Sequence, residues 1–370
     1  MAAADEQHMM RALALAARGV GAVEPNPPVG AVLVRDGAVL AEGWHERFGG
    51  PHAEAAALKA AREAGVDTRG ATAYVTLEPC CDFPGKKTPP CADALIAAGV
   101  TRVVIAMTDP DAYVGGRGVA RLRDAGVQVD VGVCERAAHE LLAPYVTLRT
   151  TRRPWVICKW AQTADGYLAR PGRRWVTGEA ARRRVHDVRA ICDGILVGIA
   201  TALADDPSLT NRSGSGKQPA RVVLDSRLRL PAGAKLVRTA REVPTVVVTT
   251  PKGAAQSQAH AETLRSASVE VMTVAESRDG VDLGALLDAL GRRRWTRLLV
   301  EGGSGVLRSF TSGGLVDELQ VFASPDAVGT QAGETLPRFD IADVPAAASV
   351  PSVVEQLGRD KLRHYVLRRP

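Results

Sequence analysis

One histidine, one glutamate and two cysteines form the sharpest chemical pattern in the 370-residue chain. His52-Ala53-Glu54 is followed, 26 residues after the histidine, by Glu78-Pro79-Cys80 and then by Pro89-Pro90-Cys91. One imidazole and two thiolates are the three protein ligands of a catalytic zinc ion whose fourth position is open to water. Zinc lowers the pKa of that water to near ~7, and a nearby carboxylate can carry its proton. The pattern predicts zinc ligands at His52, Cys80 and Cys91, with Glu54 as the proton carrier.

Alternatives remain for each of these residues. Taken singly, His52 and Glu54 fit helix caps and the cysteines fit core positions, but together they match the His-x-Glu and Pro-Cys signature of zinc deaminases. The usual Pro-Cys-x-x-Cys spacing is absent. Cys81 therefore competes as a ligand, and Cys80 is preferred because it directly follows Glu78-Pro79.

A second candidate site lies in the other half of the chain. Glu301-Gly302-Gly303-Ser304-Gly305 follows an apolar stretch and opens a predicted helix. Such glycines let a phosphate approach backbone N–H groups at a helix N-terminus. Because the motif is not Gly-x-Gly-x-x-Gly, a Rossmann fold is weakly indicated and a purely structural turn is equally compatible. Arg189 and Arg212 offer planar forks for a substrate phosphate, against the alternative of solvated surface charges.

Alternating helices and strands must position these residues. In the first half the patterns predict helices at His8–Arg18, Ala53–Ala64, Ala92–Ala98 and Val119–Ala125, and strands at Gly30–Val34, Ala38–Glu42, Ala73–Leu77, Arg102–Met107 and Val127–Val133. This alternation favours an α/β sandwich with mainly parallel strands and crossover connections. A Thr/Arg-rich stretch at Arg149–Pro154 precedes a new apolar strand. We therefore expect two domains, residues 1–150 and 151–370.

The second half alternates in the same way. The predicted helices are Glu179–Arg189, Leu283–Leu290 and Gly305–Ser312, and the predicted strands are Trp155–Cys158, Asp193–Val197, Arg221–Leu224, Thr245–Thr249, Val269–Val274, Arg297–Val300, Glu318–Phe322 and His364–Leu367. This order is again that of an α/β domain.

Composition narrows the class of protein. With 46% hydrophobic and 24% charged residues the chain has ordinary globular composition. Its longest apolar stretches, such as Val243–Val248, fall far short of the ~18 residues of a membrane span, and Met1–Gly19 lacks the apolar core of an export signal. The cytoplasm is therefore expected, with the clustered cysteines reduced.

Charge is distributed unequally between the halves. Residues 1–150 carry 15 Lys and Arg against 18 Asp and Glu, whereas residues 151–370 carry 32 against 23. A basic half suits phosphorylated small molecules or nucleic acid. Aromatic residues make up only 4% and no long basic run is present, so small anions are favoured and no nucleic acid is expected.

Longer motifs in the first half resemble a known family. Residues 8–135 are similar to the deaminase half of the bifunctional riboflavin-biosynthesis deaminase/reductase, the RibD family, through Pro25-Asn26-Pro27-Pro28-Val29-Gly30, Gly43-Trp44-His45, Pro51-His52-Ala53-Glu54, Thr76-Leu77-Glu78-Pro79-Cys80-Cys81, Lys87-Thr88-Pro89-Pro90-Cys91, Asp109-Pro110 and Gly116-Arg117-Gly118. The resemblance implies a cytidine-deaminase-like α/β/α sandwich with zinc on His52, Cys80 and Cys91. It also implies substrate contacts from Asn26, His45, Lys87 and Asp109. The loop from Cys80 to Cys91 is two residues longer than expected, and Asp82 stands where histidine is usual.

Residues 154–325 resemble the reductase half of the same family. The motifs are Lys159-Trp160-Ala161-Gln162-Thr163-Ala164-Asp165-Gly166, Trp175-Val176-Thr177, Val197-Gly198 and Asp205-Asp206-Pro207-Ser208-Leu209-Thr210-Asn211-Arg212. The resemblance implies a dihydrofolate-reductase-like fold that uses NADPH. Implied cofactor contacts are Ala161, Trp175, Thr201, Asp205, Ser226, Gly303, Ser304, Gly305 and Ser309. Implied substrate contacts are Arg173, Arg189, Leu209, Arg212 and Glu301, although Arg173 replaces a commonly small polar residue.

The resemblance implies two consecutive activities. The first is zinc-dependent hydrolytic deamination of 2,5-diamino-6-ribosylamino-4(3H)-pyrimidinone 5′-phosphate. The second is NADPH-dependent reduction of the ribosyl group to ribityl, which gives 5-amino-6-(5-phosphoribitylamino)uracil. Two alternatives remain: a nucleobase or tRNA deaminase with an appended non-catalytic reductase-like binding domain, and a dinucleotide-binding regulator with a structural zinc. A homo-oligomer is compatible with either reading.

Overall fold

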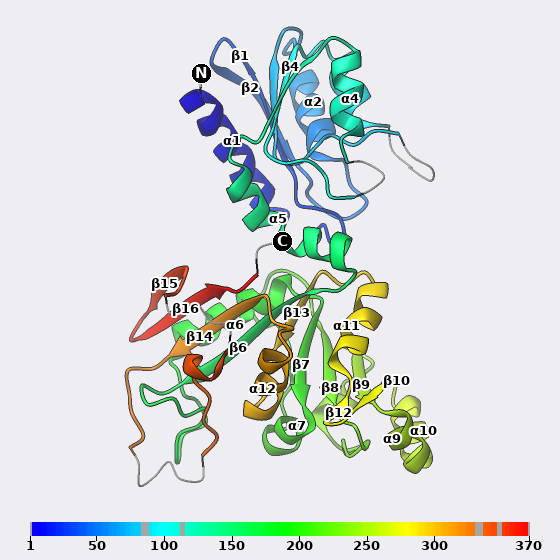
Figure 1. Cartoon of the computed structure of the whole chain (residues 1–370), viewed down its shortest axis with the longest axis vertical. Coiled ribbons are helices and arrows are strands. Elements are labelled where there is room, and N and C mark those ends of the chain that lie inside the picture. The colour runs from blue at the N-terminus through cyan, green and yellow to red at the C-terminus, as the bar shows by residue number, and fades with distance from the viewer. Residues whose placement is uncertain (1, 83–88, 112–114, 330–335, 346–349, 369–370) are drawn as a thin grey trace. The chain divides into compact units, whose positions relative to one another are not determined.

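The computed structural model describes residues 2–82, 89–111, 115–329, 336–345 and 350–368. The chain divides into two compact units, Met1–Thr151 and Arg152–Arg369, each with its own sheet (Figure 1). No helix within the described ranges combines the length and apolar character that a bilayer crossing requires.

The first unit is a five-stranded sheet with helices on both faces. Its strands are β1 (Gly30–Arg35), β2 (Ala38–Trp44), β3 (Thr72–Val75), β4 (Arg102–Ile105) and β5 (Gln128–Val131), and its helices are α1 (Ala2–Ala17), α2 (Ala53–Glu63), α3 (Cys91–Ala97), α4 (Arg117–Asp124) and α5 (Glu135–Thr151). The strand order is β2-β1-β3-β4-β5. Strands β3, β4 and β5 are parallel, but β1 is antiparallel to both of its neighbours. Four of the five strands therefore run in the same direction, as the sequence predicted, and β1 alone runs the opposite way, because a short hairpin joins it to β2.

Alternating side chains of the strands supply two cores. In β1, Ala31 and Leu33 join the core under α2, α3 and α4, whereas Val32 and Val34 join the core under α1 and α5. A strand covered on both faces is apolar at nearly every position, as β1 is. Gly43 in β2 allows α2 to come very close, since a Cβ there would lie 2.3 Å from the backbone nitrogen of Ala57. This close packing fixes the start of α2, where His52 lies.

The second unit is built on a nine-stranded sheet. Its strands are β6 (Trp155–Gln162), β7 (Gly194–Gly198), β8 (Ala220–Leu224), β9 (Thr245–Thr249), β10 (Glu270–Thr273), β13 (Arg297–Val300), β14 (Glu318–Ala323), β15 (Val353–Leu357) and β16 (Asp360–Val366), with a separate pair β11 (Glu276–Ser277) and β12 (Gly280–Val281). The order is β10-β9-β8-β7-β13-β6-β14-β16-β15. All pairs from β10 to β14 are parallel, and β16 is antiparallel to β14 and β15.

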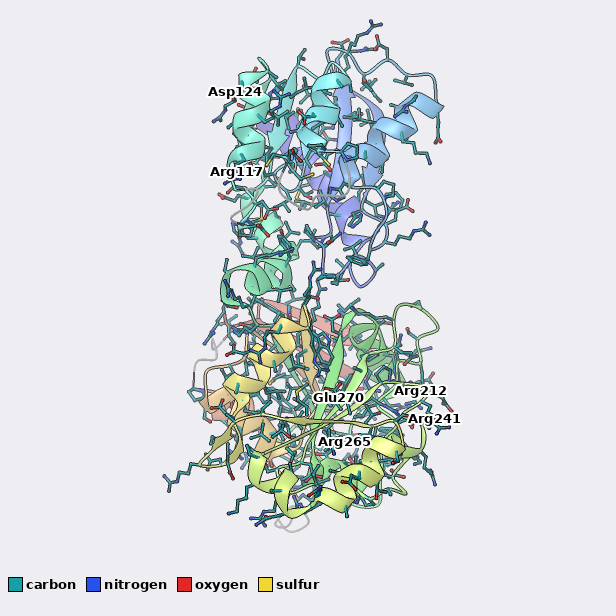
Figure 2. All side chains as sticks on the ribbon, turned by 90° about the vertical axis from the view of Figure 1, so that its right-hand side faces the viewer. Arg117, Asp124, Arg212, Arg241, Arg265 and Glu270 are labelled. Atoms are coloured by element: carbon teal, nitrogen blue, oxygen red, sulfur yellow. The ribbon has the colours of Figure 1, made fainter. Side chains whose placement is uncertain are left out.

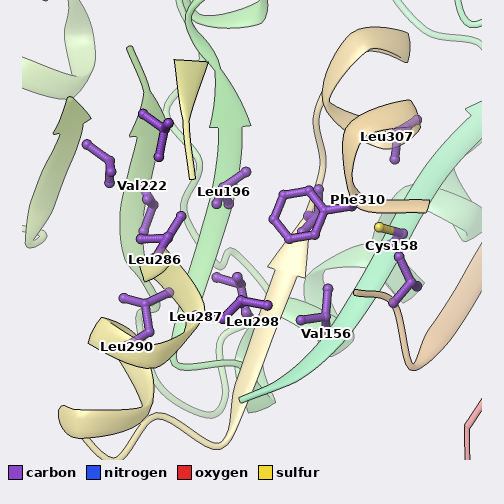
Figure 3. Packing of buried hydrophobic residues seen from close by; sticks show 14 of the residues in the cluster. Val156, Cys158, Leu196, Val222, Leu286, Leu287, Leu290, Leu298, Leu307 and Phe310 are labelled. Carbon is purple, nitrogen blue, oxygen red and sulfur yellow. The ribbon is translucent and has the colours of Figure 1, made fainter. Parts of the chain in front are cut away.

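Helices flank this sheet, and the strands meet them in a large apolar core. The helices are α6 (Glu179–Ile191), α7 (Ile199–Asp205), α8 (Lys235–Arg238), α9 (Pro251–Gln256), α10 (Gln258–Ser266), α11 (Leu283–Arg292) and α12 (Ser304–Ser312), with a 3-10 turn at Ile341–Asp343. Leu286 and Leu290 of α11 and Phe310 of α12 pack over the strands near Leu196 and Leu298 (Figure 3). Because β6, β7, β13 and β14 are parallel, their carboxyl ends share one edge, which is where ligands bind in such sheets.

Candidate active sites

The first candidate site lies where two helices begin beside the end of a strand. His52 precedes α2, Cys91 is the first residue of α3, and Cys80 lies in the loop after β3. The Nδ1 atom of His52 is 3.5 Å from Sγ of Cys80 and 3.4 Å from Sγ of Cys91. Within the described part of the chain these three residues are the one group whose ligand atoms converge as a metal site requires.

The spacing of these atoms matches zinc. Usual bond lengths of zinc to thiolate and imidazole, at a tetrahedral angle, place sulfur and nitrogen about 3.6 Å apart. The two sulfur–nitrogen distances, 3.5 and 3.4 Å, agree with that value. A protein ligand set of two thiolates and one imidazole also suits zinc by its chemistry. The backbone N–H of Cys91 donates to Sγ of Cys80 over 3.4 Å, which favours the thiolate.

Glu54 stands beside this group in the first turn of α2. Its side chain is buried, and burial together with the charge of Cys80 raises the pKa of its carboxyl to about 7. A carboxyl whose pKa lies near neutral pH can both accept and return a proton. Its environment is therefore suited to the proton transfer that the sequence pattern predicted for it.

Cys81 lies outside the group of converging ligand atoms. Its side chain is 7% exposed, and burial raises the pKa of its thiol. A neutral, buried thiol behaves as a small hydrophobic side chain. The geometry thus favours Cys80 over Cys81 as a ligand.

Asn26 and His45, two of the predicted substrate contacts, lie next to each other beside His52. The Nδ1 atom of His45 is 2.8 Å from the carbonyl oxygen of Pro51, and its Nε2 is 3.3 Å from Nδ2 of Asn26. Burial lowers the pKa of His45, so the ring is neutral and donates from Nδ1 while Nε2 accepts from the Asn26 amide. The His45 and His52 rings lie 5.5 Å apart. Lys87, the third predicted contact here, lies outside the described residues.

Asp109, the fourth predicted contact, lies in the loop after β4. Glu78 ties this loop to the strand end that carries Cys80, because its carboxylate accepts from the backbone N–H groups of Asp109, Gly116 and Val119 at 2.9–3.2 Å. Gly118 permits the approach of α4, since a Cβ there would lie 2.0 Å from the carbonyl oxygen of Pro79. The sequence analysis treats Glu78 only as part of the Glu-Pro-Cys motif and misses its role in holding this loop.

The second candidate site contains a buried cluster of charges at the carboxyl ends of the strands. Glu301 follows β13 and accepts from Nε and Nη2 of Arg189 at 2.7 and 2.9 Å. Nζ of Lys159, from β6, lies 3.6 Å from the same carboxylate. Burial alone would raise the pKa of Glu301, but the charges of Arg189 and Lys159 lower it to about 2. Lys159 was not assigned a role from sequence, although a lysine inside an apolar strand is a usable signal.

This cluster changes the interpretation of Arg189. Its remaining nitrogen, Nη1, donates to the carbonyl oxygen of Thr210 over 2.9 Å, so each of the three nitrogens makes one hydrogen bond to protein. Glu301 occupies the edge of the guanidinium formed by Nε and Nη2, and the contact of Arg189 with the substrate phosphate stays a prediction. Arg212, in contrast, has an exposed side chain (Figure 2). Leu209 is buried with φ +48° in the same segment.

A cavity of about 700 Å³ adjoins the glycine turn. Five of the predicted cofactor contacts line it: Thr201, Ser226, Gly303, Gly305 and Ser309. Gly303 donates from its backbone N–H to Oγ1 of Thr201 over 3.1 Å, which ties the turn to α7. A Cβ at Gly305 would meet no atom within 4 Å, so open space lies over the start of α12. Both the size of the cavity and this open helix start fit part of a phosphorylated dinucleotide.

The other predicted contacts are dispersed. Arg173 and Trp175 line a second cavity of about 550 Å³. Ala161, Asp205 and Ser304 line neither of these two cavities. The structure therefore groups the glycine turn with Thr201 and Ser226, and places Trp175 apart from that group.

The chain has full-length relatives. Residues 154–340 match the family model described as the RibD C-terminal domain, and residues 2–107 match the cytidine and deoxycytidylate deaminase zinc-binding region. The riboflavin biosynthesis protein RibD of Aquifex aeolicus is 40% identical over 96% of each chain. That of Escherichia coli is 39% identical, covering 92% of this chain and 94% of its own.

Solved structures agree with this result. A Thermotoga maritima protein described as a diaminohydroxyphosphoribosylaminopyrimidine deaminase and 5-amino-6-(5-phosphoribosylamino)uracil reductase superposes with a TM-score of 0.84, at 35% identity and 99% coverage of both chains. RibD from Acinetobacter baumannii gives a TM-score of 0.83 at 33% identity over the whole of both chains. The predicted α/β fold class is confirmed, and so is the prediction of a zinc- and NADPH-dependent enzyme. The chain belongs to the RibD family and joins a zinc-binding deaminase domain to a reductase domain in an enzyme of riboflavin biosynthesis.

Proposed function

We propose that residues 1–150 deaminate 2,5-diamino-6-ribosylamino-4(3H)-pyrimidinone 5′-phosphate and that residues 151–370 reduce the ribosyl group of the product to ribityl. The names of the relatives support both reactions, and the observation that carries the proposal is the convergence of His52, Cys80 and Cys91 beside buried Glu54. In the first reaction water replaces the amino group and ammonia leaves.

In the first reaction we assign His52, Cys80 and Cys91 as the zinc ligands. Zinc, when bound, supplies a water molecule whose pKa is lowered to about 7. Glu54 would accept the proton that the attacking water loses and pass it to the departing amine, which leaves as ammonia. Asn26, oriented by neutral His45, and the carboxylate of Asp109 offer hydrogen bonds to the pyrimidine and its sugar. Lys87 keeps its predicted contact with the substrate.

In the second reaction NADPH supplies the hydride. We assign Thr201, Ser226, Gly303, Gly305 and Ser309 to the cofactor, because they line one cavity at the start of α12. The carboxylate of Glu301 and the ammonium of Lys159 face one another at the strand ends, where the sugar of the substrate would be held. Such positioning is the main contribution that the protein makes when a cofactor carries the chemistry.

We assign the substrate phosphate of the second reaction to the exposed Arg212 instead of Arg189. Three of the five N–H donors of Arg189 bind Glu301 and Thr210, and we therefore assign Arg189 the role of orienting Glu301. Arg173, Leu209, Ala161, Trp175, Asp205 and Ser304 keep the contacts that the family resemblance implies. A homo-oligomer, the absence of a nucleic-acid partner and a cytoplasmic location stay predictions.

A two-step assay tests the proposal. Purified enzyme receives the diaminopyrimidine phosphate with zinc, and ammonia is measured; NADPH is then added and its oxidation is followed. We expect ammonia release first and NADPH oxidation only after it. The Glu54→Ala variant should release no ammonia, but it should still oxidise NADPH when the deaminated compound is supplied. Ammonia from RNA or free cytidine, with none from the pyrimidine phosphate, would refute the proposal in favour of a nucleobase deaminase.

A further inference from the structure

Tyr145 is a buried residue of α5 whose hydroxyl reaches Asp109, a predicted substrate contact of the deaminase domain. Its side chain is 5% exposed, and the hydroxyl donates to Asp109, with distances of 3.0 Å to Oδ1 and 3.3 Å to Oδ2. Oδ1 also accepts from the backbone N–H of Asp111 over 2.9 Å. Oδ1 thus has two protein donors, whereas Oδ2 has only the longer tyrosine contact within the described residues.

The groups around Asp109 act on the pKa of its carboxyl in opposite directions. Burial raises the pKa of Asp109 to about 6, and the negative charge of Asp111 acts in the same direction. The N–H of Asp111, the hydroxyl of Tyr145 and the positive charge of Arg149 oppose that rise. Arg149, one turn beyond Tyr145 on α5, pairs with Asp111 at 3.3 Å and lies 5.2 Å from the centre of the tyrosine ring. Glu78 faces the backbone N–H of Asp109.

We propose that Tyr145 is a positioning residue for the deamination, whose O–H group keeps Asp109 ionised and turns Oδ2 toward hydroxyl or amino donors of the substrate. The inference rests on the proposed function, which places Asp109 against the substrate. Tyr145 touches no substrate itself and acts through Asp109. An ionised carboxylate is needed because both of its oxygens must accept hydrogen bonds.

The test compares KM and kcat of ammonia release against pH in the full-length zinc-loaded enzyme and in Tyr145→Phe. Loss of one hydrogen bond to a carboxylate moves its pKa upward by about half to one unit. As the pH falls, the KM of the variant should therefore begin to rise at a pH about half to one unit higher than the KM of the parent enzyme does. Below both pKa values KM should be about three- to tenfold larger, while kcat and bound zinc stay unchanged.

Tyr74→Phe is the matched control. Tyr74 is also buried, packs in the same core as Tyr145, and donates to a different carboxylate, Oδ1 of Asp5, over 2.7 Å. This variant loses one tyrosine hydroxyl from the same core without touching the loop of Asp109. Its KM profile should equal that of the parent enzyme. Equal shifts in both tyrosine variants would overturn the proposal, because they would reflect general loosening of the domain.

The variant Asp109→Asn distinguishes a failure of the role of Tyr145 from a failure of the proposed substrate contact of Asp109. We expect this variant to have a raised KM at all pH values, and adding Tyr145→Phe should shift nothing further. If Asp109→Asn alters KM but Tyr145→Phe leaves the profile unchanged, the role of Tyr145 is refuted and the proposed function stands. If Asp109→Asn has no effect on KM, the substrate contact of Asp109 fails and the inference fails with it.

Discussion

Replacing Arg189 by methionine tests the buried charge cluster of the reductase domain. The substitution keeps a long apolar stem but removes three hydrogen bonds, two to the carboxylate of Glu301 and one to the carbonyl of Thr210. Glu301 is then left with Lys159, 3.6 Å away, as its remaining ion-pair partner among the described residues. Because the side chains of Arg189 and Glu301 are only 13% and 9% exposed, water compensates poorly.

The expected loss of stability follows from this burial. Removing one partner of a buried ion pair costs about 3–5 kcal/mol, and the remaining lysine places this case near about 3 kcal/mol. Arg183→Met on the same helix is the control. Its i,i+4 contact with Glu179 has side chains that are 74% and 71% exposed. Such exposed pairs contribute about 0.5 kcal/mol or less.

Urea unfolding followed by tryptophan fluorescence measures the difference. Trp155, Trp160, Trp175 and Trp295 lie in the reductase domain and only Trp44 lies in the deaminase domain, so the signal reports mainly the former. Arg189→Met should unfold at lower urea and oxidise NADPH slowly, while its ammonia release equals that of the parent. Unfolding midpoints and NADPH oxidation that match those of Arg183→Met would refute the interpretation of this cluster.

Three further predictions concern other residues. Glu54→Gln should retain zinc, as measured by metal analysis, and lose about 10²–10⁴-fold in kcat of ammonia release, because no carboxylate carries the proton; wild-type kcat would contradict this role. Since the pKa of Glu301 is lowered from 4.5 to about 2, its contribution to stability is present above pH 4.5 and is lost as pH falls toward 2. The stability of Glu301→Gln should lack that dependence on pH during acid unfolding. An acid-unfolding curve equal to that of the parent enzyme would contradict this contribution of Glu301. Gly305→Ala fills the open space at the start of α12, so KM for NADPH should rise without loss of stability, whereas unchanged KM would place the cofactor elsewhere.

The zinc site was predictable because residue types alone restrict its chemistry. His52, Cys80 and Cys91 suit one metal and one geometry, and the turn before each helix brings them to the end of β3. The sequence already favoured Cys80 over Cys81, because Cys80 directly follows Glu78-Pro79, and the structure supports that preference. In the sequence, Cys80 and Cys81 differ only in the residues that precede them. The burial of Cys81 can be seen only in the structure.

Helix α5 and the contacts of Arg189 could not be predicted from sequence patterns. Pro144 lies within α5, and threonines crowd its end, both of which disfavour a helix. Thr150 and Thr151 donate instead to carbonyl oxygens one turn back, at 2.8 and 2.6 Å. Arg189 and Glu301 are 112 residues apart, and no local pattern shows that a distant carboxylate fills an arginine fork.

Zinc content of three cysteine variants tests the central claim most directly. Metal analysis of the purified full-length enzyme should give one zinc per chain for the parent and for Cys81→Ser. Cys80→Ser and Cys91→Ser should each lose most of their zinc and all ammonia release, because a thiolate ligand is gone. Undiminished zinc in Cys91→Ser, or loss of zinc in Cys81→Ser with retention in Cys80→Ser, would contradict the assigned site.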